Sequence, residues 1–231
     1  MNKPNLPVSP RKSRVALWLA LAFILALIGW WELAAPRAPG AATPQPAALA
    51  QPAGSEVAVL AGGCFWCTEA DFDKLPGVLS TTSGYTGGTT ANPTYAEVSS
   101  HATGHAEAVR VVFDPKQVSY AQLLAHFWKT IDPTVKDRQF CDIGTPYRTA
   151  IFATTPEQLQ LAKASLAALA QSKPFAEPVV TQIVRLDDFY PAEAEHQNYH
   201  QNNPVRYNYY RTSCGRDARL KQLWGASSAG Q

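Results

Sequence analysis

Residues 57–72, VAVLAGGCFWCTEADF, decide both the local fold and the chemistry of this chain. The apolar run that opens the segment predicts a short buried strand, and the two glycines predict a tight turn before a helix that begins at Cys64. A helix start offers unpaired backbone N–H groups and a positive dipole end, so the pattern predicts a lowered pKa and a nucleophilic thiolate for Cys64. Phe65 and Trp66 add an apolar wall, which indicates redox or covalent chemistry on a small apolar group.

Charge is unevenly distributed along the 231 residues. Before Ser55 there are five basic residues and one acid, whereas from Ser55 onward there are 15 Lys and Arg against 17 Asp and Glu. The later part has no basic run of the kind that binds nucleic acid, so we expect no nucleic-acid partner. Hydrophobic residues make up 46% of the sequence, which is sufficient for one packed domain of medium size.

The first 54 residues resemble a targeting segment and a tether. Residues 1–14 are basic, and residues 15–33 are predicted to be a transmembrane anchor or a signal segment whose basic flank stays in the cytoplasm. An uncleaved anchor is favoured, and a cleaved signal peptide is the alternative. Residues 34–54 are predicted to be a linker, because 14 of these 21 residues are Ala or Pro. A segment of this composition cannot bury enough surface to fold, and its prolines keep it extended.

These features predict one domain over residues 55–225, followed by a disordered tail over 226–231. The expected location is the bacterial inner membrane facing the periplasm, or the periplasm itself if the leader is cleaved.

Strands and helices are expected to alternate along the domain. Strands are predicted at 108–113, 148–154 and 179–186, and helices from Ser119, from Thr155 to about Gln171, and over Pro191 to Asn202. This order favours an α+β fold, a two-layer α/β sandwich with a ferredoxin-like (split βαβ) core, a mixed sheet and long loops.

Four cysteines stand at positions 64, 67, 141 and 214. Structural zinc sites use two close Cys pairs, and only one such pair exists here, so we expect no metal. A structural disulfide in an oxidising compartment would suit Cys141 with Cys214. It suits Cys64 poorly, because the aromatic neighbours and helix start of Cys64 favour reactivity.

Acidic and tyrosine residues recur together in two further segments. The first comprises TYAEV at 94–98 with TGHAEAV at 103–109, and the second is FCDIGTPYRTA at 140–150. Glu107 begins an apolar strand, where burial would raise its pKa and keep it protonated. A solvated loop charge is the alternative for each acid taken alone.

Together these segments closely resemble the A-type peptide methionine sulfoxide reductases. The resemblance spans residues 57–203 and is carried by GGCFW at 62–66, the Tyr95 segment, GHAE at 104–107, DIGTPYR at 142–148 and FYPAE at 189–193.

The resemblance implies a role for each residue. Cys64 would attack the sulfoxide sulfur, Glu107 would protonate the sulfoxide oxygen, and Tyr95 and Tyr147 would hold that oxygen. Asp142 would orient water or the substrate backbone. Phe65 and Trp66 would form the pocket for the S-methyl group, and Cys64 would end as a sulfenic acid.

A second thiol must then resolve the sulfenic acid. The resemblance ranks Cys214 first, as a cysteine of a mobile C-terminal tail. Cys67 follows because i and i+3 side chains share a helix face, and Cys141 is third because it abuts Asp142. The family also implies reduction of methionine-S-sulfoxide, free or in proteins, a thioredoxin-like dithiol as electron donor and no bound cofactor. We expect a monomer.

Two other functions fit parts of the sequence. Cys64 and Cys67 could serve a thioredoxin-like thiol–disulfide oxidoreductase, in which case Glu107, Tyr95, Tyr147 and Asp142 would have no task. A membrane-tethered binding module with structural disulfides is the non-enzymatic alternative, and it would contain no activated thiol.

Overall fold

The computed structural model describes residue 49 and residues 51–225. The predicted anchor over residues 15–33, most of the predicted linker and the predicted tail over 226–231 lie outside these described residues. Within the described part of the chain, no helix has both the length and the apolar character needed to cross a membrane.

A six-stranded mixed sheet forms the centre of the domain, in the order β7-β6-β1-β3-β2-β8. All neighbouring strands are antiparallel except β6 and β7, which are parallel. Its strands are β1 (Glu56–Gly62), β2 (Val78–Thr86), β3 (Ala106–Phe113), β6 (Thr149–Ala153), β7 (Gln182–Arg185) and β8 (Phe189–Pro191). A separate hairpin pairs β4 (Arg138–Gln139) with β5 (Asp142–Ile143).

The order of the central strands explains where the reactive segment lies. Strands β1 and β2 are joined through helix α2 (Phe65–Phe72), and β3 lies between them in the sheet, as in a split βαβ unit. The predicted α+β fold with a mixed sheet is therefore confirmed. The carboxyl end of β1 and the start of β3 lie at the same edge of the sheet because the two strands are antiparallel.

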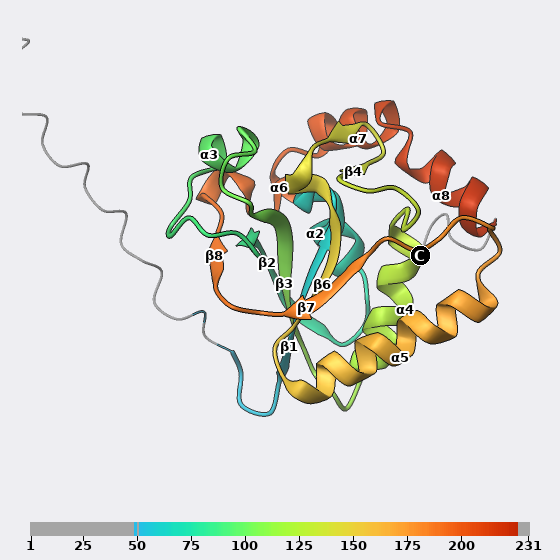
Figure 1. Cartoon of the computed structure of the whole chain (residues 1–231). Helices are drawn as coiled ribbons and strands as arrows, with labels where there is room; N and C mark the ends of the chain where they lie inside the picture. Colours follow the sequence, from blue (N-terminus) through green and yellow to red (C-terminus); the bar gives the residue numbers. More distant parts are fainter. Residues whose placement is uncertain (1–48, 50, 226–231) are drawn as a thin grey trace, which may run out of the picture. The chain divides into compact units, whose positions relative to one another are not determined.

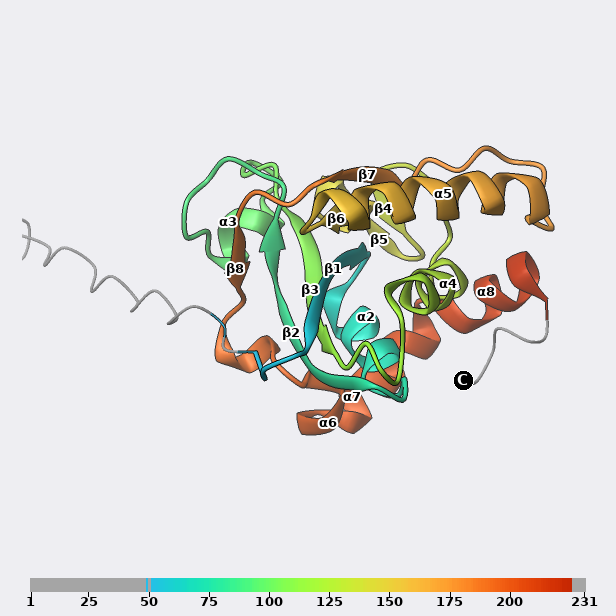
Figure 2. The same cartoon turned by 90° about the horizontal axis from the view of Figure 1, so that it is seen from below.

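Helices cover one face of the sheet, as Figures 1 and 2 show. Helices α2, α4, α5 and α8 share one large hydrophobic core with β1 and β3. A smaller core with mostly small side chains, among them Val59, Ala61 and Ala108, lies on the other face. The remaining helices are α3 (Tyr95–Ser99), α4 (Tyr120–Thr130), α5 (Pro156–Ser172), α6 (Tyr199–Asn202), α7 (Pro204–Ser213) and α8 (Arg216–Trp224).

Two of the predicted helix starts are confirmed by their caps. The Ser119 side chain accepts a hydrogen bond from the Gln122 N–H at the start of α4, and the Thr155 side chain accepts one from the Gln158 N–H at the start of α5. Each cap satisfies a backbone donor that the first helical turn leaves unpaired.

The C-terminal third differs from the prediction. The helix expected over Pro191 to Asn202 is wrong: the segment contains the end of β8, a 3-10 turn (Ala194–His196) and the short helix α6. The Gln197 side chain bonds to both backbone groups of Ser83, and Asn198 has a φ of +50°, which ends any continuous helix there. Residues 204–224, for which no helix was predicted, form α7 and α8.

Candidate active site

Cys64 lies at the cap position of α2, directly after the turn that leaves β1. Gly63 has a φ of +87°, and a Cβ there would come within 2.4 Å of the Gln139 side chain, so the turn requires glycine. The predicted strand, turn and helix are confirmed, and the Cys64 side chain is 6% exposed.

The predicted effect of the helix start on Cys64 is wrong in direction. Burial raises the pKa of the Cys64 thiol well above its ordinary value, and the Cys67 sulfur and the Glu107 carboxyl raise it further. The first N–H of α2, that of Phe65, donates to Glu107 Oε2 at 3.0 Å instead of serving the thiol. Burial and these two neighbours therefore favour the neutral thiol form of Cys64.

Cys67 is the second free thiol, and it is 2% exposed. The Cys64 thiol hydrogen-bonds to the Cys67 sulfur and lowers the pKa of Cys67 against the opposing effect of burial. The positive charges of Arg216 and Arg211 lower the pKa of Cys67 further. The two arginines thus favour ionisation of Cys67, one helical turn from Cys64.

Glu107 is the second residue of β3 and is 2% exposed. Burial raises the pKa of its carboxyl to about 8, in the direction that the sequence predicts, although the Phe65 N–H opposes the shift. Because β1 and β3 are antiparallel neighbours, Glu107 comes to the same end of the sheet as Cys64. A neutral carboxyl beside a thiol is equipped to donate a proton near pH 7.

Tyr95 and Tyr147 face the same carboxyl from two different segments. Burial raises the pKa of both phenols, and the charges of Glu107, Cys64 and Asp142 contribute to each shift. Tyr95 begins α3, and Tyr147 ends the 3-10 turn after β5. The structure thus brings together all five residues that the sequence analysis assigned to catalysis.

The two predicted pocket residues are placed differently. Phe65 is 1% exposed, with its ring 6.4 Å from that of Tyr95 and 5.9 Å from that of Tyr85, so it forms the floor of the site. Trp66 is partly exposed and stacks on Tyr199 with ring centroids 3.8 Å apart. Trp66 therefore presents the larger apolar surface to a ligand.

His196 and Glu193 position these side chains, a function that local sequence patterns did not reveal. His196 Nδ1 accepts a hydrogen bond from Trp66 Nε1 at 3.3 Å, and its ring lies 4.3 Å from that of Tyr95. Glu193 accepts from the Tyr95 N–H and from the Tyr85 hydroxyl, both at 2.7 Å. The sequence signals were the FYPAE segment at 189–193, which ends in Glu193, and the position of His196 in the polar stretch after β8.

Cys141 and Cys214 form a disulfide, as the structural-disulfide alternative allowed. Cys214 lies at the end of α7 and not in a mobile tail, which corrects that implication of the resemblance. Cys141, Asp142 and Cys214 are the one group of potential metal ligands found among the described residues, but two of its sulfurs are bonded to each other and offer no thiolate.

Tyr210 connects the disulfide to the buried thiols. Its hydroxyl donates to Asp142 Oδ2 and also lies within hydrogen-bonding reach of the Cys64 sulfur. Its ring packs edge-on against Trp66 at 5.8 Å. Arg216, the first residue of α8, is 2% exposed and anchors that helix by donating hydrogen bonds to the carbonyls of Gly62 and Thr130. The C-terminal helices thus form one wall of the site.

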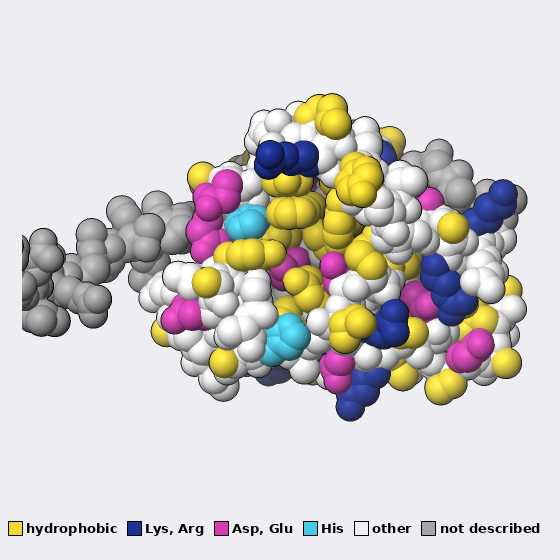
Figure 3. Space-filling view, turned by 90° about the horizontal axis from the view of Figure 1, so that it is seen from above, with side chains coloured by type: hydrophobic (Ala, Val, Ile, Leu, Met, Phe, Trp, Pro, Cys, Tyr) yellow, Lys and Arg dark blue, Asp and Glu magenta, His cyan; other side chains and the backbone are white. Residues whose placement is uncertain are grey.

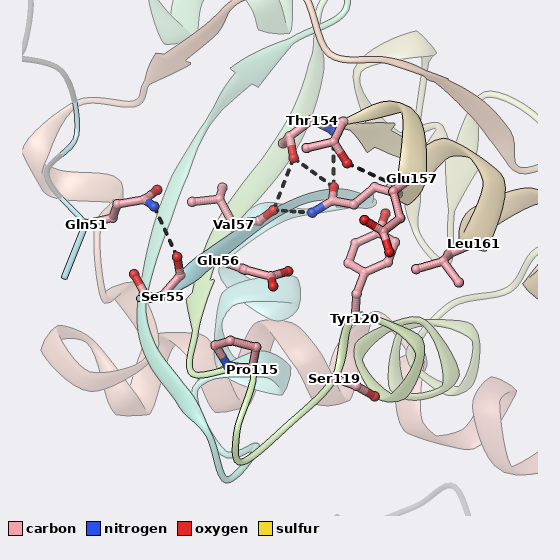
Figure 4. A pocket seen from close by; sticks show the side chains of 12 residues that line it. Gln51, Ser55, Glu56, Val57, Pro115, Ser119, Tyr120, Thr154, Glu157 and Leu161 are labelled. Atoms are coloured by element: carbon pink, nitrogen blue, oxygen red, sulfur yellow. Dashed lines mark hydrogen bonds between the residues drawn. The ribbon is translucent and has the colours of Figure 1, made fainter. Parts of the chain in front are cut away.

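The face shown in Figure 3 has a hollow around which hydrophobic side chains gather, with acidic side chains inside it. A different concavity of about 570 Å³, drawn in Figure 4, lies where β1 begins and is lined by Glu56, Tyr120, Thr154 and Glu157, among others. It contains no cysteine, and β1 separates it from Cys64 by roughly 20 Å at 3.3 Å per residue. The concavity of Figure 4 is therefore not the site of thiol chemistry.

Two buried thiols, a carboxyl with a raised pKa and two phenols near the Phe65 and Trp66 rings are the groups of a thiol-dependent oxidoreductase with its own general acid. Residues 56–228 match the family model described as peptide methionine sulfoxide reductase. The chain belongs to the peptide methionine sulfoxide reductase family.

Individual relatives agree with this assignment. The chain is 50% identical over 170 residues to peptide methionine sulfoxide reductase MsrA of Bacillus licheniformis, covering 74% of this chain and 94% of that protein. It is 50% identical over 169 residues to the MsrA/MsrB protein of Vibrio cholerae, covering 73% of this chain but only 45% of that longer protein. Methionine sulfoxide reductase A of Corynebacterium diphtheriae has a similar structure, with a TM-score of 0.61 and 37% identity, covering 70% of this chain and 83% of that one.

Proposed function

We propose that the chain reduces methionine-S-sulfoxide, free or in oxidised proteins, to methionine. The observation that carries this proposal is the convergence of Cys64, Glu107, Tyr95 and Tyr147 at one end of the sheet. A thiol–disulfide oxidoreductase would need only the two cysteines and would leave the acid and the phenols without a task. Thiol attack on a sulfoxide needs all of these groups, because the oxygen must be protonated as it leaves sulfur.

In the first step the Cys64 sulfur forms a bond to the sulfoxide sulfur while the Glu107 carboxyl gives its proton to the oxygen. The proton on Cys64 passes to the Cys67 sulfur, which already accepts a hydrogen bond from it. Tyr95 and Tyr147 hold the oxygen by hydrogen bonds, and Asp142 orients water or the substrate backbone. The hydroxyl then transfers from the substrate sulfur to the Cys64 sulfur as the bond between the two sulfurs breaks, so that methionine leaves and Cys64 becomes a sulfenic acid.

Phe65 and Trp66 bind the S-methyl group between them. The aromatic faces and edges of these rings favour contacts with a polarisable sulfur. The contacts of Trp66 with His196 and Tyr199 hold its ring in place for this role.

Resolution of the sulfenic acid falls first to Cys67. Its sulfur contacts Cys64, and its thiol, which carries the proton received from Cys64, can attack the Cys64 sulfur and pass that proton to the departing hydroxyl, which leaves as water. Cys214 and Cys141 are paired with each other, so they follow as the second dithiol, which reduces the Cys64–Cys67 disulfide after their own reduction. No bound cofactor takes part, and a thioredoxin-like dithiol supplies the electrons.

The predicted leader supports a location outside the cytoplasm for this chemistry. The predicted anchor over residues 15–33 and linker over 34–54 would hold a monomeric domain at the bacterial inner membrane, facing the periplasm. The mass of the mature protein tests this proposal: a start after residue 35 would exclude the anchor and leave a periplasmic protein.

The activity is tested with the two separate epimers of a methionine sulfoxide peptide, with dithiothreitol as reductant. We expect turnover of the S epimer alone, and its loss in Cys64→Ser. If folded protein turned over neither epimer but reduced insulin, the thioredoxin-like function would be correct.

A further inference from the structure

The concavity of Figure 4 has no role in the thiol chemistry, but it has the size of a small-molecule site. Its volume is about 570 Å³, within the range of roughly 300 to 1,000 Å³ that such sites occupy. Its walls come from the start of β1, the loop before α4, and the starts of α4 and α5, which are far apart in the sequence. The tertiary fold, and not one local turn, therefore forms this concavity.

Two carboxylates are the only charged side chains among the described residues that line the concavity. Glu56 is the first residue of β1, Glu157 lies in the first turn of α5, and both side chains are exposed. Neither carboxylate has a hydrogen bond or an ion pair with another residue in the described part of the chain. Two unpaired negative charges at one site favour a cation.

A buried hydroxyl adds a third polar group. Tyr120 begins α4 and is 5% exposed, yet its hydroxyl has no hydrogen-bond partner among the described residues. Figure 4 shows its ring extending from α4 toward Glu157. Burial raises the pKa of the phenol, so the group stays neutral and its oxygen can accept a hydrogen bond. Because buried polar groups are normally paired, this hydroxyl indicates a polar partner from outside the chain.

The polar groups at the base of the concavity are already paired with one another. Gln158 is 6% exposed, and its side-chain oxygen accepts from both the N–H and the hydroxyl of Thr154. Its side-chain nitrogen donates to the Val57 carbonyl at 2.7 Å. These bonds fix the base and leave the two glutamates and the Tyr120 hydroxyl to contact a ligand.

An anion is the alternative ligand, because the starts of α4 and α5 face the same concavity and helix starts attract anions. Each start, however, already has a side-chain cap, from Ser119 and from Thr155. An anion would also lie beside two carboxylates, with no lysine or arginine among the described lining residues. The charges therefore favour a cation.

Apolar groups complete the lining. Val57, Pro115 and Leu161 lie along the concavity, and Leu161 is 38% exposed. Their contact with a ligand would remove apolar surface from water, which favours a cation that carries a short alkyl chain.

We propose that the concavity of Figure 4 binds an aliphatic primary ammonium group, carried by a free amine or by a lysine side chain. Such a group has three N–H donors, and three elements supply acceptors for them: Glu56 from β1, Tyr120 from α4 and Glu157 from α5. The alkyl chain packs on the apolar side chains of the lining. This inference goes beyond the proposed reductase function and does not rest on it.

The ligand class is tested by ligand-observed NMR titration of the full-length chain with n-butylammonium chloride. Sodium butyrate has a similar alkyl chain with the opposite charge and should not bind. Tetramethylammonium has the charge without N–H donors, so its affinity should be at least about tenfold lower. Binding of n-butylammonium should weaken as salt rises from about 20 mM to about 500 mM, because the carboxylates are exposed.

The site is tested with three variants that keep side-chain shape. Glu56→Gln and Glu157→Gln should each raise the Kd about tenfold, because each removes a charge-assisted hydrogen bond. Tyr120→Phe should raise it about fivefold, since only the hydroxyl is lost. Glu177→Gln, an exposed position outside the concavity, is the matched control and should bind like the unmodified chain. Circular dichroism checks that each variant is folded.

The two sources of the ammonium group are distinguished with Nα-acetyl-lysine amide. Tighter binding than that of n-butylammonium would assign the site to lysine side chains, and weaker binding would assign it to free amines. No binding of either compound, equal binding of butyrate, or a Kd that all three variants leave unchanged would overturn the proposal. Because no turnover is measured, failure of the reductase function would not affect this result.

Discussion

The two cysteine pairs of this domain lie a short distance apart but in opposite environments. Cys64 and Cys67 are buried free thiols at the start of α2, where Cys67 packs with Ala70 and Tyr207. Cys141 and Cys214 join a hairpin tip to the end of α7 at the surface, as a disulfide. Tyr210 lies between the pairs, within reach of Cys64 on one side and of Asp142 on the other.

This contrast separates two requirements that conflict at a single site. Sulfoxide reduction gains from burial, which keeps Glu107 protonated and excludes water from the developing charge. Re-reduction of the oxidised enzyme by another protein, in contrast, needs a sulfur that the other protein can reach. Because the buried pair serves sulfoxide reduction and the surface pair serves re-reduction, each pair can have the environment that its own reaction needs.

The strongest test of the contrast is Cys64→Ser. Because a serine hydroxyl is a far weaker nucleophile than a thiol, we expect turnover with dithiothreitol to fall by about 10³-fold or more. Cys67→Ser serves as the control, since it should still complete one turnover and leave a sulfenic acid that dimedone labels. Substantial activity in Cys64→Ser would place the chemistry at another cysteine.

Glu107→Gln tests whether the buried carboxyl of Glu107 supplies the proton that the sulfoxide oxygen takes up. An amide cannot donate as a carboxylic acid does, so kcat should fall by about 10²- to 10³-fold. The unmodified enzyme should lose activity as the pH rises through about 8, because the acid must be protonated and Glu107 loses its proton there. The variant should lack that decline, and an identical pH profile in both proteins would contradict the assignment.

Cys141→Ser tests whether the surface pair is needed for re-reduction of the enzyme by thioredoxin. A single turnover without reductant, in which the unmodified protein starts with its Cys141–Cys214 disulfide intact, should give one methionine per chain in both proteins because Cys64 and Cys67 remain. Continuous turnover with thioredoxin should fall about tenfold or more, since the buried pair is inaccessible to a protein thiol. Normal cycling in both Cys141→Ser and Cys214→Ser would show that the disulfide is only structural.

Local sequence patterns predicted the interior well. The strand, glycine turn and helix around Cys64, and the buried acid at the start of β3, depend on runs of neighbouring residues whose burial follows from periodicity. The error in the pKa of Cys64 has a long-range cause, because Glu107 takes the helix-start N–H from 42 residues away in the chain. The position of Cys64 at a helix start was therefore not sufficient to predict the pKa of its thiol.

The surface pair and its supports depend almost entirely on distant contacts. Tyr210 bonds to Asp142 across 68 positions, and Trp66 to His196 across 130. Arg216 reaches Gly62 across 154. Helix α7 is strongly polar and has little apolar periodicity, so its helical state depends on packing that no short window of sequence reveals.

Tyr210→Phe tests the connection between the pairs. The ring can still pack on Trp66, but the hydrogen bond to Asp142 and the contact with Cys64 are lost. We expect kcat to fall by roughly fivefold, about the value of one hydrogen bond, with KM nearly unchanged. A loss as large as that of Glu107→Gln would mean that Tyr210 takes a direct part in catalysis.

Glu69 tests how the stability of the buried region depends on pH. It is a second buried acid, on the helix that carries Cys67. Its side chain is 0% exposed, and burial raises its pKa to about 7, with the charge of Asp73 adding to the shift. The backbone N–H groups of Asn198 and Tyr199 face the carboxyl, yet neither of its oxygens completes a hydrogen bond. Folding thus favours the protonated form.

A folded-state pKa above the unfolded value means that the folded chain binds more protons. The stabilisation by Glu69 is therefore complete below the unfolded pKa of about 4.3 and is lost as the pH rises through about 7. Glu69→Gln has no such titration, so its free energy of unfolding relative to the unmodified protein should increase by roughly 1 to 3 kcal/mol between pH 5 and pH 8. Urea unfolding at the two pH values measures this change. Since Glu107 titrates in both proteins, its effect cancels, and a difference independent of pH would show that Glu69 is already ionised in the folded protein.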